Sequence, residues 1–242
     1  MRIRIISNPK KDWALSLAAK LVPHLSGAGH RVVKKGADAT ICIGGDGTIL
    51  YASHRGRVEG AVLGIGGEKS YICQLRRDDW ESGIDGALAS QKEKIMSLEC
   101  ALGGKKFIAL NDVVIHASHY RVAEMDVSIR AGGRKLETAF EGDGMIVSTP
   151  LGSAAYAYSA GGAKLAPTER KISVVPICPY KRAFQPATFP EDGEVGITVG
   201  SDCAFITDGI FVRRLKKGEA VSVRKGPDID FFEGVGRYDK QG

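Results

Sequence analysis

The residues with the clearest chemistry form a short run that follows an apolar segment. Residues 39–43 are expected to be a buried strand, residues 44–48 read Gly-Gly-Asp-Gly-Thr, and residues 49–54 can continue as a helix. Glycines allow positive φ and a close approach of the backbone to a ligand, and a strand–turn–helix junction presents free N–H groups to an anion. The alternative is a tight turn without function. The strand context and the embedded Asp46 favour a phosphate site, formed by Gly44, Gly45, Gly47 and Thr48.

A second glycine-rich stretch, at 64–70, fails as a phosphate motif. Its sequence resembles a P-loop, but Glu68 stands where a glycine must precede the lysine. It is not a GxGxxG dinucleotide turn either, because Lys69 occupies the place of the last glycine. The phosphate prediction therefore depends on residues 44–48.

An amide and a carboxylate stand side by side at Asn111 and Asp112. Such a pair can hydrogen-bond adenine edges and ribose hydroxyls. The other interpretation is an ordinary turn before a strand, where Asn-Asp is common. Taken alone, the pair does not decide between the two.

Residues 143–162 form a longer segment that is suited to a flat ligand. The pattern predicts a strand up to Thr149, a turn, and then a short helix of small residues. Small side chains let the backbone approach a ring, and Tyr156 can cover that ring, while Ser153 and Ser159 offer hydroxyls. The other interpretation is a packing helix rich in serine and alanine. A serine hydrolase is excluded, because the segment has no GxSxG motif.

These motifs together resemble those of the NAD kinase family. Residues 44–48 match the GGDGT signature that NAD kinases share with diacylglycerol and sphingosine kinases and, as GGDGS, with phosphofructokinases. The Asn-Asp pair at 111–112 resembles the family's Asn-Glu motif, and residues 143–162 resemble its DG-(apolar)-STPTGSTAYSLSAGG block at most positions. Residues 175–179 resemble the family's TPICPH, and the Asp-Gly pair at 208–209 resembles its late DG.

The resemblance implies a phosphotransferase that acts on the 2′-hydroxyl of the adenosine ribose of NAD to give NADP, with ATP or polyphosphate as donor. It assigns Asp46 to the reacting hydroxyl, as general base or as its orienter. No protein metal cage is visible, so Mg²⁺ or another divalent cation is expected to arrive with the donor, held by phosphates and water. The family also implies homodimers or homotetramers. The NAD-binding residues expected on this basis are Asp46, Gly47, Asn111, Asp112, Asp143, Ala154, Ala155, Tyr156 and Ser159.

Departures from the family pattern leave two other functions open. Ala154 replaces a threonine of the family's STAY, and residues 66–72 do not match its INxGxLGFL loop. A non-catalytic NAD(P)-binding sensor would tolerate such changes, although the retained Asp46 argues against it. A lipid kinase of the diacylglycerol kinase type shares the glycine run but should lack the Asn-Asp pair and the 143–162 segment. Binding of NADP without turnover would favour the sensor, and membrane-dependent activity on diacylglycerol would favour the lipid kinase.

The elements that must position these residues fall into two groups. In residues 1–92 strand and helix signals alternate, which is typical of a Rossmann-like open parallel sheet in an α/β domain. In residues 93–225 strand candidates follow one another, which predicts an antiparallel all-β domain. The tail at 226–242 could pack back on the first domain. The glycine run then belongs to the first domain and the dinucleotide pocket to the second.

Helices are expected from Lys10 to about Leu25, bent or ended by Pro23, and after a cap at Asp78. Apolar runs predict the strands 2–7, 39–43, 61–65, 95–101, 107–110, 113–116, 122–130, 134–139, 145–149, 172–175, 195–199, 204–207, 211–214 and 220–224.

Composition favours anionic partners in a reducing compartment. With 34 Lys and Arg against 28 Asp and Glu, the net charge is +6, which favours phosphates or nucleotides. Nucleic-acid binding is not expected, because no basic stretch is interleaved with aromatics. A membrane partner is not expected either, because no apolar run approaches the roughly 18 residues of a span. Residues 1–6 indicate a first strand rather than a signal peptide, and five scattered cysteines indicate a cytoplasmic protein.

Overall fold

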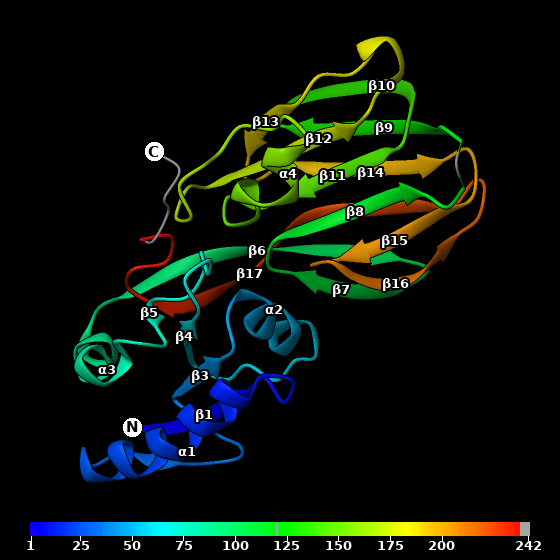
Figure 1. Ribbon diagram of the computed structural model, residues 1–242. Coiled ribbons are helices and arrows are strands. Elements are labelled where there is room, and N and C mark those ends of the chain that lie inside the picture. The colour runs from blue at the N-terminus through cyan, green and yellow to red at the C-terminus, as the bar shows by residue number, and fades with distance from the viewer. Residues whose placement is uncertain (120, 238–242) are drawn as a thin grey trace. The chain divides into compact units, whose positions relative to one another are not determined.

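The computed structural model describes residues 1–119 and 121–237 (Figure 1). The chain forms two compact units. The N-terminal unit comprises Met1–Ile95 together with the segment that starts at Ile229, and the C-terminal unit comprises Met96–Asp228. The boundaries expected from the sequence, after 92 and after 225, each lie a few residues earlier. Strands β6 and β17 carry the chain from one unit to the other.

The N-terminal unit is an α/β domain built on a parallel sheet of order β2-β1-β3-β4, with β5 and the last residues of β17 also paired to β4. Every residue of β3 and β4 is buried, as expected for parallel strands covered on both faces. The strands of this unit are β1 (Arg2–Ser7), β2 (Arg31–Val32), β3 (Ala39–Ile43), β4 (Ala61–Gly66) and β5 (Leu75–Arg76).

Helices cover both faces of this sheet. Leu21 of α1 (Asp12–Gly27) and Ile84 of α3 (Trp80–Ala89) belong to one apolar cluster with Ile41 and Leu63 of the strands. On the other face, Ile49 of α2 (Asp46–His54) lies against Gly64, where a Cβ would come within 2.7 Å of its Cδ1 atom. The sheet is therefore held between α1 and α3 on one side and α2 on the other.

Two local features of the helices differ from expectation: Pro23 does not end its helix, and the cap position of α3 is shifted by one residue. Pro23 lies inside α1, which continues to Gly27, because Leu21 and Leu25 on either side of it are both buried in the apolar cluster. Packing of that face outweighs the one backbone hydrogen bond that proline removes. The cap position of α3 is Asp79 rather than Asp78, and the Asp79 carboxylate accepts from the Arg76 N–H instead of capping the helix.

The C-terminal unit is an antiparallel β-sandwich. One sheet has the order β10-β9-β14-β17, with β6 paired to β17 and β7 to β6, and the other has the order β13-β12-β11-β8-β15-β16. Their inner faces form one core, in which Val127 and Ile197 of the first sheet meet Ile115 and Phe205 of the second. The strands are β6 (Lys92–Leu102), β7 (Lys105–Ala109), β8 (Asp112–Ala117), β9 (Ala123–Ala131), β10 (Arg134–Gly142), β11 (Gly144–Ser148), β12 (Lys171–Ile177), β13 (Ala187–Pro190), β14 (Glu194–Val199), β15 (Cys203–Thr207), β16 (Ile210–Leu215) and β17 (Ala220–Phe232).

Short helical pieces cover the outer face of the second sheet. Ala157 of α4 (Tyr156–Ser159) packs on Val114, Ile146 and Val175. The 3₁₀ turns η1 (Gly152–Ala154) and η2 (Tyr180–Arg182) lie on either side of β12 along the chain. The 143–162 segment is therefore anchored to strands β8, β11 and β12. In the described part of the chain, no helix is both long and apolar enough to cross a membrane.

Candidate functional site

The Gly-Gly-Asp-Gly-Thr run joins the end of β3 to the start of α2, as the sequence predicts. Gly44 and Gly45 have φ of 142° and 95°, which residues with a Cβ rarely adopt. A Cβ on Gly44 would lie 2.4 Å from Thr48 Oγ1 and 2.6 Å from Asn8 Cβ. Both glycines also donate their N–H groups to the Ile65 carbonyl, at 3.0 and 3.3 Å. The turn is thus fixed to β4 and has no room for a side chain at Gly44.

The start of α2 is where the run offers backbone donors to an anion. The N–H groups of Asp46 and Gly47 precede the first intrahelical bond, whereas the Thr48 N–H donates to the Gly45 carbonyl at 2.9 Å. The N–H groups of Gly44 and Gly45 are already engaged. Phosphate binding by all four residues stays a prediction, but in this conformation only part of the run can donate from its backbone.

A buried hydroxyl without a partner lies beside this turn. The Thr48 side chain is 7% exposed, and its Oγ1 has no hydrogen-bond partner among the described residues. Two depressions, of about 460 and 470 Å³, share Asn8, Gly47 and Thr48 in their walls. The first of them also contains Lys11, Gly44, Gly45, Asp46 and residues 67–70.

Asp46 is the first residue of α2, and a neighbouring loop holds its carboxylate. One oxygen accepts from the Tyr71 N–H at 2.7 Å and the other from the Ile72 N–H at 3.0 Å. A carboxylate has about four lone-pair sites, so it can still accept a hydrogen bond from a hydroxyl. Burial, and next the charge of Asp46, raise the pKa of the Cys73 thiol well above its usual value. Cys73 is therefore neutral beside Asp46.

In the C-terminal unit, the Asn-Asp pair is held by a carboxylate from a distant part of the chain. Asp208, which follows β15, accepts the N–H groups of Leu110, Asn111 and Asp112 at 2.8, 2.6 and 3.2 Å. Its own N–H donates to the Asp112 carbonyl at 2.9 Å. Asp208 has φ of 51°, a strained value for a residue other than glycine. This reciprocal set fixes the loop between β7 and β8.

The two carboxyl groups of this loop are both buried and both perturbed. Burial, and then the charge of Asp208, raise the pKa of Asp112 to about 7. Burial raises the pKa of Asp208 to about 6, although its three backbone donors act in the opposite direction. Two carboxyl groups that titrate near neutral pH are more common at functional sites than in ordinary cores.

The turn after β11 is tied to the same loop. Thr149 Oγ1 donates to the Leu110 carbonyl at 2.7 Å and accepts from the Gly152 N–H at 3.0 Å. A Cβ on Gly152 would lie 2.2 Å from the Asn111 carbonyl oxygen. The side-chain oxygen of Asn111 is buried and has no partner among the described residues. The backbone of Asn111 is therefore fixed while its side chain can still accept a ligand donor.

Tyr156 lies within electrostatic range of three groups near this loop. Burial is the main cause that raises the pKa of Tyr156. Electrostatic interactions with Cys178, Asp143 and Asp112 raise it further, in that order of size. Tyr156 is 42% exposed, so a ligand can contact its ring. Asp143 is the linker between β10 and β11, and its N–H donates to the Ile177 carbonyl at 2.9 Å. Of the dinucleotide residues predicted in this unit, Asp112, Asp143 and Tyr156 thus lie near one another, with Cys178 beside them.

The serine hydroxyls of the segment are used within the fold. Ser153 is fully buried and donates to the Pro150 carbonyl at 2.6 Å, so it is a turn residue and not a ligand group. The Ser159 hydroxyl donates to the Ala155 carbonyl at 3.4 Å, although its side chain is exposed. Ala154 is half-buried in η1. Of the two hydroxyls expected to face a ligand, only that of Ser159 is accessible.

Sequence reasoning missed three features of these sites. Lys11 donates to the Gly44 carbonyl at 2.6 Å from 33 residues away, and no local motif announces it. The backbone N–H groups of residues 71–72 hold Asp46, and backbone donors of this kind do not depend on which side chains the two residues carry. Asp208 matched a family motif, but its role as an acceptor for the 110–112 loop needed the fold. An acidic residue followed by glycine after a strand is the one available signal.

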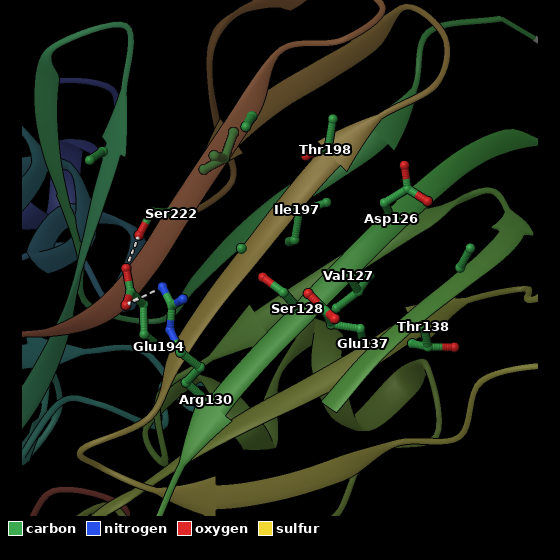
Figure 2. A pocket seen from close by; sticks show the side chains of 15 residues that line it. Asp126, Val127, Ser128, Arg130, Glu137, Thr138, Glu194, Ile197, Thr198 and Ser222 are labelled. Carbon is green, nitrogen blue, oxygen red and sulfur yellow. Dashed lines mark hydrogen bonds and ion pairs between the residues drawn. The ribbon is translucent and has the colours of Figure 1, made fainter. Parts of the chain in front are cut away.

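A further depression, of about 720 Å³, lies over β9, β14 and β17 of the C-terminal unit (Figure 2). Figure 2 shows Glu194 in its wall, bound to both Arg130 and Ser222, at 3.0 and 2.9 Å. The charges of Glu194 and Arg130 in the wall of this depression therefore partly neutralise each other. None of the site residues predicted from the sequence lines it.

Metal ligands are not grouped in the described part of the chain, where no three His, Cys, Asp or Glu side chains come together as a cation site. His116, one of two histidines close in sequence, interacts through Nδ1 with the Ala117 carbonyl at 3.0 Å.

Comparison with known proteins identifies the family. The family model described as the ATP-NAD kinase C-terminal domain matches residues 110–230. An NAD kinase of Thermomicrobium roseum is 33% identical over 215 residues, which cover 81% of this chain and 73% of that protein. An NAD kinase of Thermoplasma volcanium is 30% identical over 241 residues, which cover 95% of this chain and 86% of that protein.

Two solved structures share the fold. Yeast NADH kinase complexed with NADH matches with a TM-score of 0.84 at 21% identity, over 96% of this chain and 82% of that one. An NAD kinase from Archaeoglobus fulgidus in complex with ATP matches with a TM-score of 0.82 at 20% identity, over 100% of this chain and 97% of that one. With the family model and the curated relatives, these findings agree with the motifs at 44–48, 111–112 and 143–162: the chain belongs to the NAD kinase family.

Proposed function

We propose that the protein is an NAD kinase, which transfers a phosphoryl group from ATP or polyphosphate to the 2′-hydroxyl of the adenosine ribose of NAD. The observation that carries the proposal is the arrangement at Asp46. Its carboxylate stands at the first residue of α2, directly after a glycine turn that lines a cavity. At such a position the N–H groups at the start of α2 can bind a phosphate, and the Asp46 carboxylate can accept a hydrogen bond from the acceptor hydroxyl.

Three groups of the C-terminal unit support NAD binding there. Asn111 has a buried acceptor without a partner, Asp112 is buried beside it, and Tyr156 exposes part of its ring. These groups fit an adenine edge, a ribose hydroxyl and a flat ring respectively. We propose that they bind NAD together with Asp143, Ala154, Ala155 and Ser159.

In the reaction, the 2′-oxygen would attack the terminal phosphorus of the donor while the bond from that phosphorus to its bridging oxygen breaks. Asp46 would accept the hydroxyl hydrogen bond and orient the oxygen, or take its proton. Phosphoryl transfer requires positioning and charge neutralisation more than a strong base. A divalent cation, which neutralises phosphate charge when bound, would enter with the donor, held mostly by phosphates and water.

The first test incubates purified protein with NAD, ATP and Mg²⁺ and measures NADP with a dehydrogenase that accepts only NADP. Polyphosphate replaces ATP in a parallel reaction. In another, NADH replaces NAD, and the product NADPH is measured by its oxidation with a dehydrogenase specific for NADP(H). NADP formation that falls by about 10²–10⁴ in Asp46→Asn would support the proposal, because that is the usual loss with a general base. The unfolding midpoint of the variant must stay close to that of the wild type.

Two results would redirect the proposal. Near-full turnover by a folded Asp46→Asn variant would remove Asp46 from the reaction. No product with any donor, despite measurable NAD or NADP binding, would favour a non-catalytic NAD(P)-binding sensor. The engagement of both Asp46 oxygens by the 71–72 backbone is the feature that would then need explanation.

We also propose a homodimer or homotetramer in the cytoplasm. The support for assembly is the resemblance to the family. The support for a reducing compartment is that all five cysteines are free, with four of them buried. Light scattering on the purified protein would give the mass in solution.

A further inference from the structure

Lys11 places an ammonium group at the glycine turn. Its Nζ donates to the Gly44 carbonyl at 2.6 Å, and a Cβ built on Gly45 would lie 4.0 Å from it. The loop that carries Lys11 is itself fixed, because the Asn8 N–H donates to the Ile43 carbonyl at 2.8 Å and the Lys11 N–H to the Asn8 carbonyl at 3.2 Å. The charge therefore stands beside the run that is expected to bind phosphate.

Among the described residues, no carboxylate forms an ion pair with the Lys11 ammonium. The Lys11 ammonium contacts the Gly44 carbonyl and the ring of Trp13, whose centroid is 5.8 Å away, and both groups are uncharged. The Lys11 ammonium thus has no ion-pair partner among the described residues in the 460 Å³ cavity that it lines, although Asp46 and Glu68 line that cavity too. An anion is the natural complement of the ammonium charge.

A second observation points to a ligand in the same cavity. The buried Thr48 Oγ1 lines the cavity and has no partner, although a hydroxyl can both donate and accept. The N–H groups of Gly44 and Gly45 are taken up by Ile65. The turn thus offers fewer backbone donors than its sequence suggests. Other groups must therefore help to neutralise the charge of a bound phosphate.

We propose that Lys11 is a donor-binding residue, whose ammonium contacts the terminal phosphates of ATP or polyphosphate in the cavity at residues 44–48. The proposal rests on the kinase function proposed above, which it deepens. The P-loop spacing is broken in this chain because Glu68 precedes Lys69. Lys11, from the loop between β1 and α1, supplies the lysine that a P-loop would carry within its own glycine run.

The contact has a defined chemical effect. An ammonium is a compact point charge with three donors, so it can keep its bond to the Gly44 carbonyl and still donate to a phosphate oxygen. It would neutralise charge on the donor and align the terminal phosphorus. Because NAD is bound by other groups, loss of the ammonium should change the donor constants and leave the dinucleotide constants unchanged.

The test compares Lys11→Met and Lys11→Arg with wild type, and uses Lys20→Met as matched control. Methionine keeps an apolar chain beside Trp13 but removes the charge. Lys20→Met removes the same charge from an exposed position of α1, the helix that follows the loop of Lys11. Calorimetry measures the binding of inorganic tripolyphosphate alone, and the NADP assay measures KM for ATP and for NAD. Thermal unfolding confirms that each variant is folded.

We expect Lys11→Met to bind tripolyphosphate and ATP at least roughly tenfold more weakly, which is the loss of one charge-assisted hydrogen bond. Lys11→Arg should recover most of the affinity, and Lys20→Met should match the wild type. KM for NAD should stay unchanged in all variants. The tripolyphosphate affinity of the wild type should also fall more steeply with salt than that of Lys11→Met.

Three results would overturn the inference. One is unchanged tripolyphosphate binding by a folded Lys11→Met variant, and another is the absence of tripolyphosphate binding by the wild type. The third is a parallel rise of KM for NAD and for ATP, because that would show that Lys11 only holds the turn. Tripolyphosphate binding is measured without any reaction. A wild type that binds it through Lys11 but forms no NADP would therefore refute the proposed function and not this one.

Discussion

At the scale of single residues, three of the site carboxylates differ in what surrounds them. Asp46 is half-buried and receives two backbone N–H groups, Asp208 is buried and receives three, and Asp112 is buried beside the charge of Asp208. The same side chain can therefore orient a substrate, hold a loop or stay protonated near neutral pH, and the environment decides which.

The first prediction concerns Asp112 and pH. Its pKa is about 7 in the folded state against about 3.9 in an unfolded chain, so the folded state holds the extra proton between these values. The contribution of Asp112 to stability therefore falls as pH rises from about 4 to about 7. Asp112→Asn removes this fall, so the variant should gain stability over wild type across that window, on the order of a few kcal/mol. Denaturant unfolding at several pH values measures it.

Asp202→Asn is the control for that experiment, because Asp202 is partly exposed and its pKa is lowered by the hydrogen bond from Lys216. Its profile should not show a gain between pH 4 and 7. Parallel profiles for wild type and Asp112→Asn would mean that Asp112 is ionised in the folded protein at low pH.

The second prediction concerns Asp208 as a positioning residue. In Asp208→Asn, one of the two side-chain oxygens becomes an NH₂ group, which faces a backbone N–H of residues 110–112 in either orientation. The loop should shift, and KM for NAD should rise roughly tenfold, in line with about 1.5–3 kcal/mol for a hydrogen bond to a charged group. KM for ATP should stay near the wild-type value. Steady-state kinetics with each substrate varied in turn would reveal an equal rise in both, which would contradict the assignment.

At the scale of elements, the strands were predictable where an apolar run stood between turn residues. Residues 39–43 and 61–65 became β3 and β4, and the predicted antiparallel strands after residue 92 appear in their predicted order, although β13 was not predicted. Two-residue strands such as β2 and β5 carry too little pattern to be found. β17 runs to Phe232, well past the predicted end at residue 224, because its last residues pair with β4 and not with the sandwich.

The site was less predictable than the elements that carry it. The run at 44–48 and the pair at 111–112 are local, so sequence could find them. The contacts that fix them come from Lys11 and Asp208, which are 33 and nearly 100 residues away along the chain. A short-range pattern contains no information about which distant side chain the fold will bring to a turn.

The third prediction belongs to the turn between β11 and α4. In Gly152→Ala, the new Cβ would meet the Asn111 backbone, with its carbonyl oxygen 2.2 Å away. The two segments must separate, so we expect a destabilised protein with weaker NAD binding. Gly86→Ala in α3 is the matched control, because nothing lies within 4 Å of its new Cβ and alanine favours a helix by up to about 1 kcal/mol. Thermal unfolding should move in opposite directions for the two variants, and equal shifts would contradict the clash.

At the scale of the whole molecule, the chain builds its two units in an interrupted order. The N-terminal unit is complete only when the segment that starts at Ile229 returns to it. There Phe231 pairs with Val62 of β4, and the Phe232 carbonyl accepts from Gln74 Nε2 at 2.9 Å. The unit that carries Asp46 therefore depends on residues that follow the whole C-terminal unit along the chain.

The last prediction tests this dependence with Phe232→Ala. Phe232 is 1% exposed and belongs to the apolar cluster of the N-terminal unit, so its truncation should destabilise that unit by about 3–5 kcal/mol. Hydrogen exchange should show lost protection in β1, β3 and β4, while β8, β11 and β12 keep theirs. Phe211→Ala, at a side chain that is 58% exposed, should leave both sets protected. If Phe232→Ala lowers protection equally in both sets, the two units unfold as one, and the glycine turn and the dinucleotide loop share a single stability.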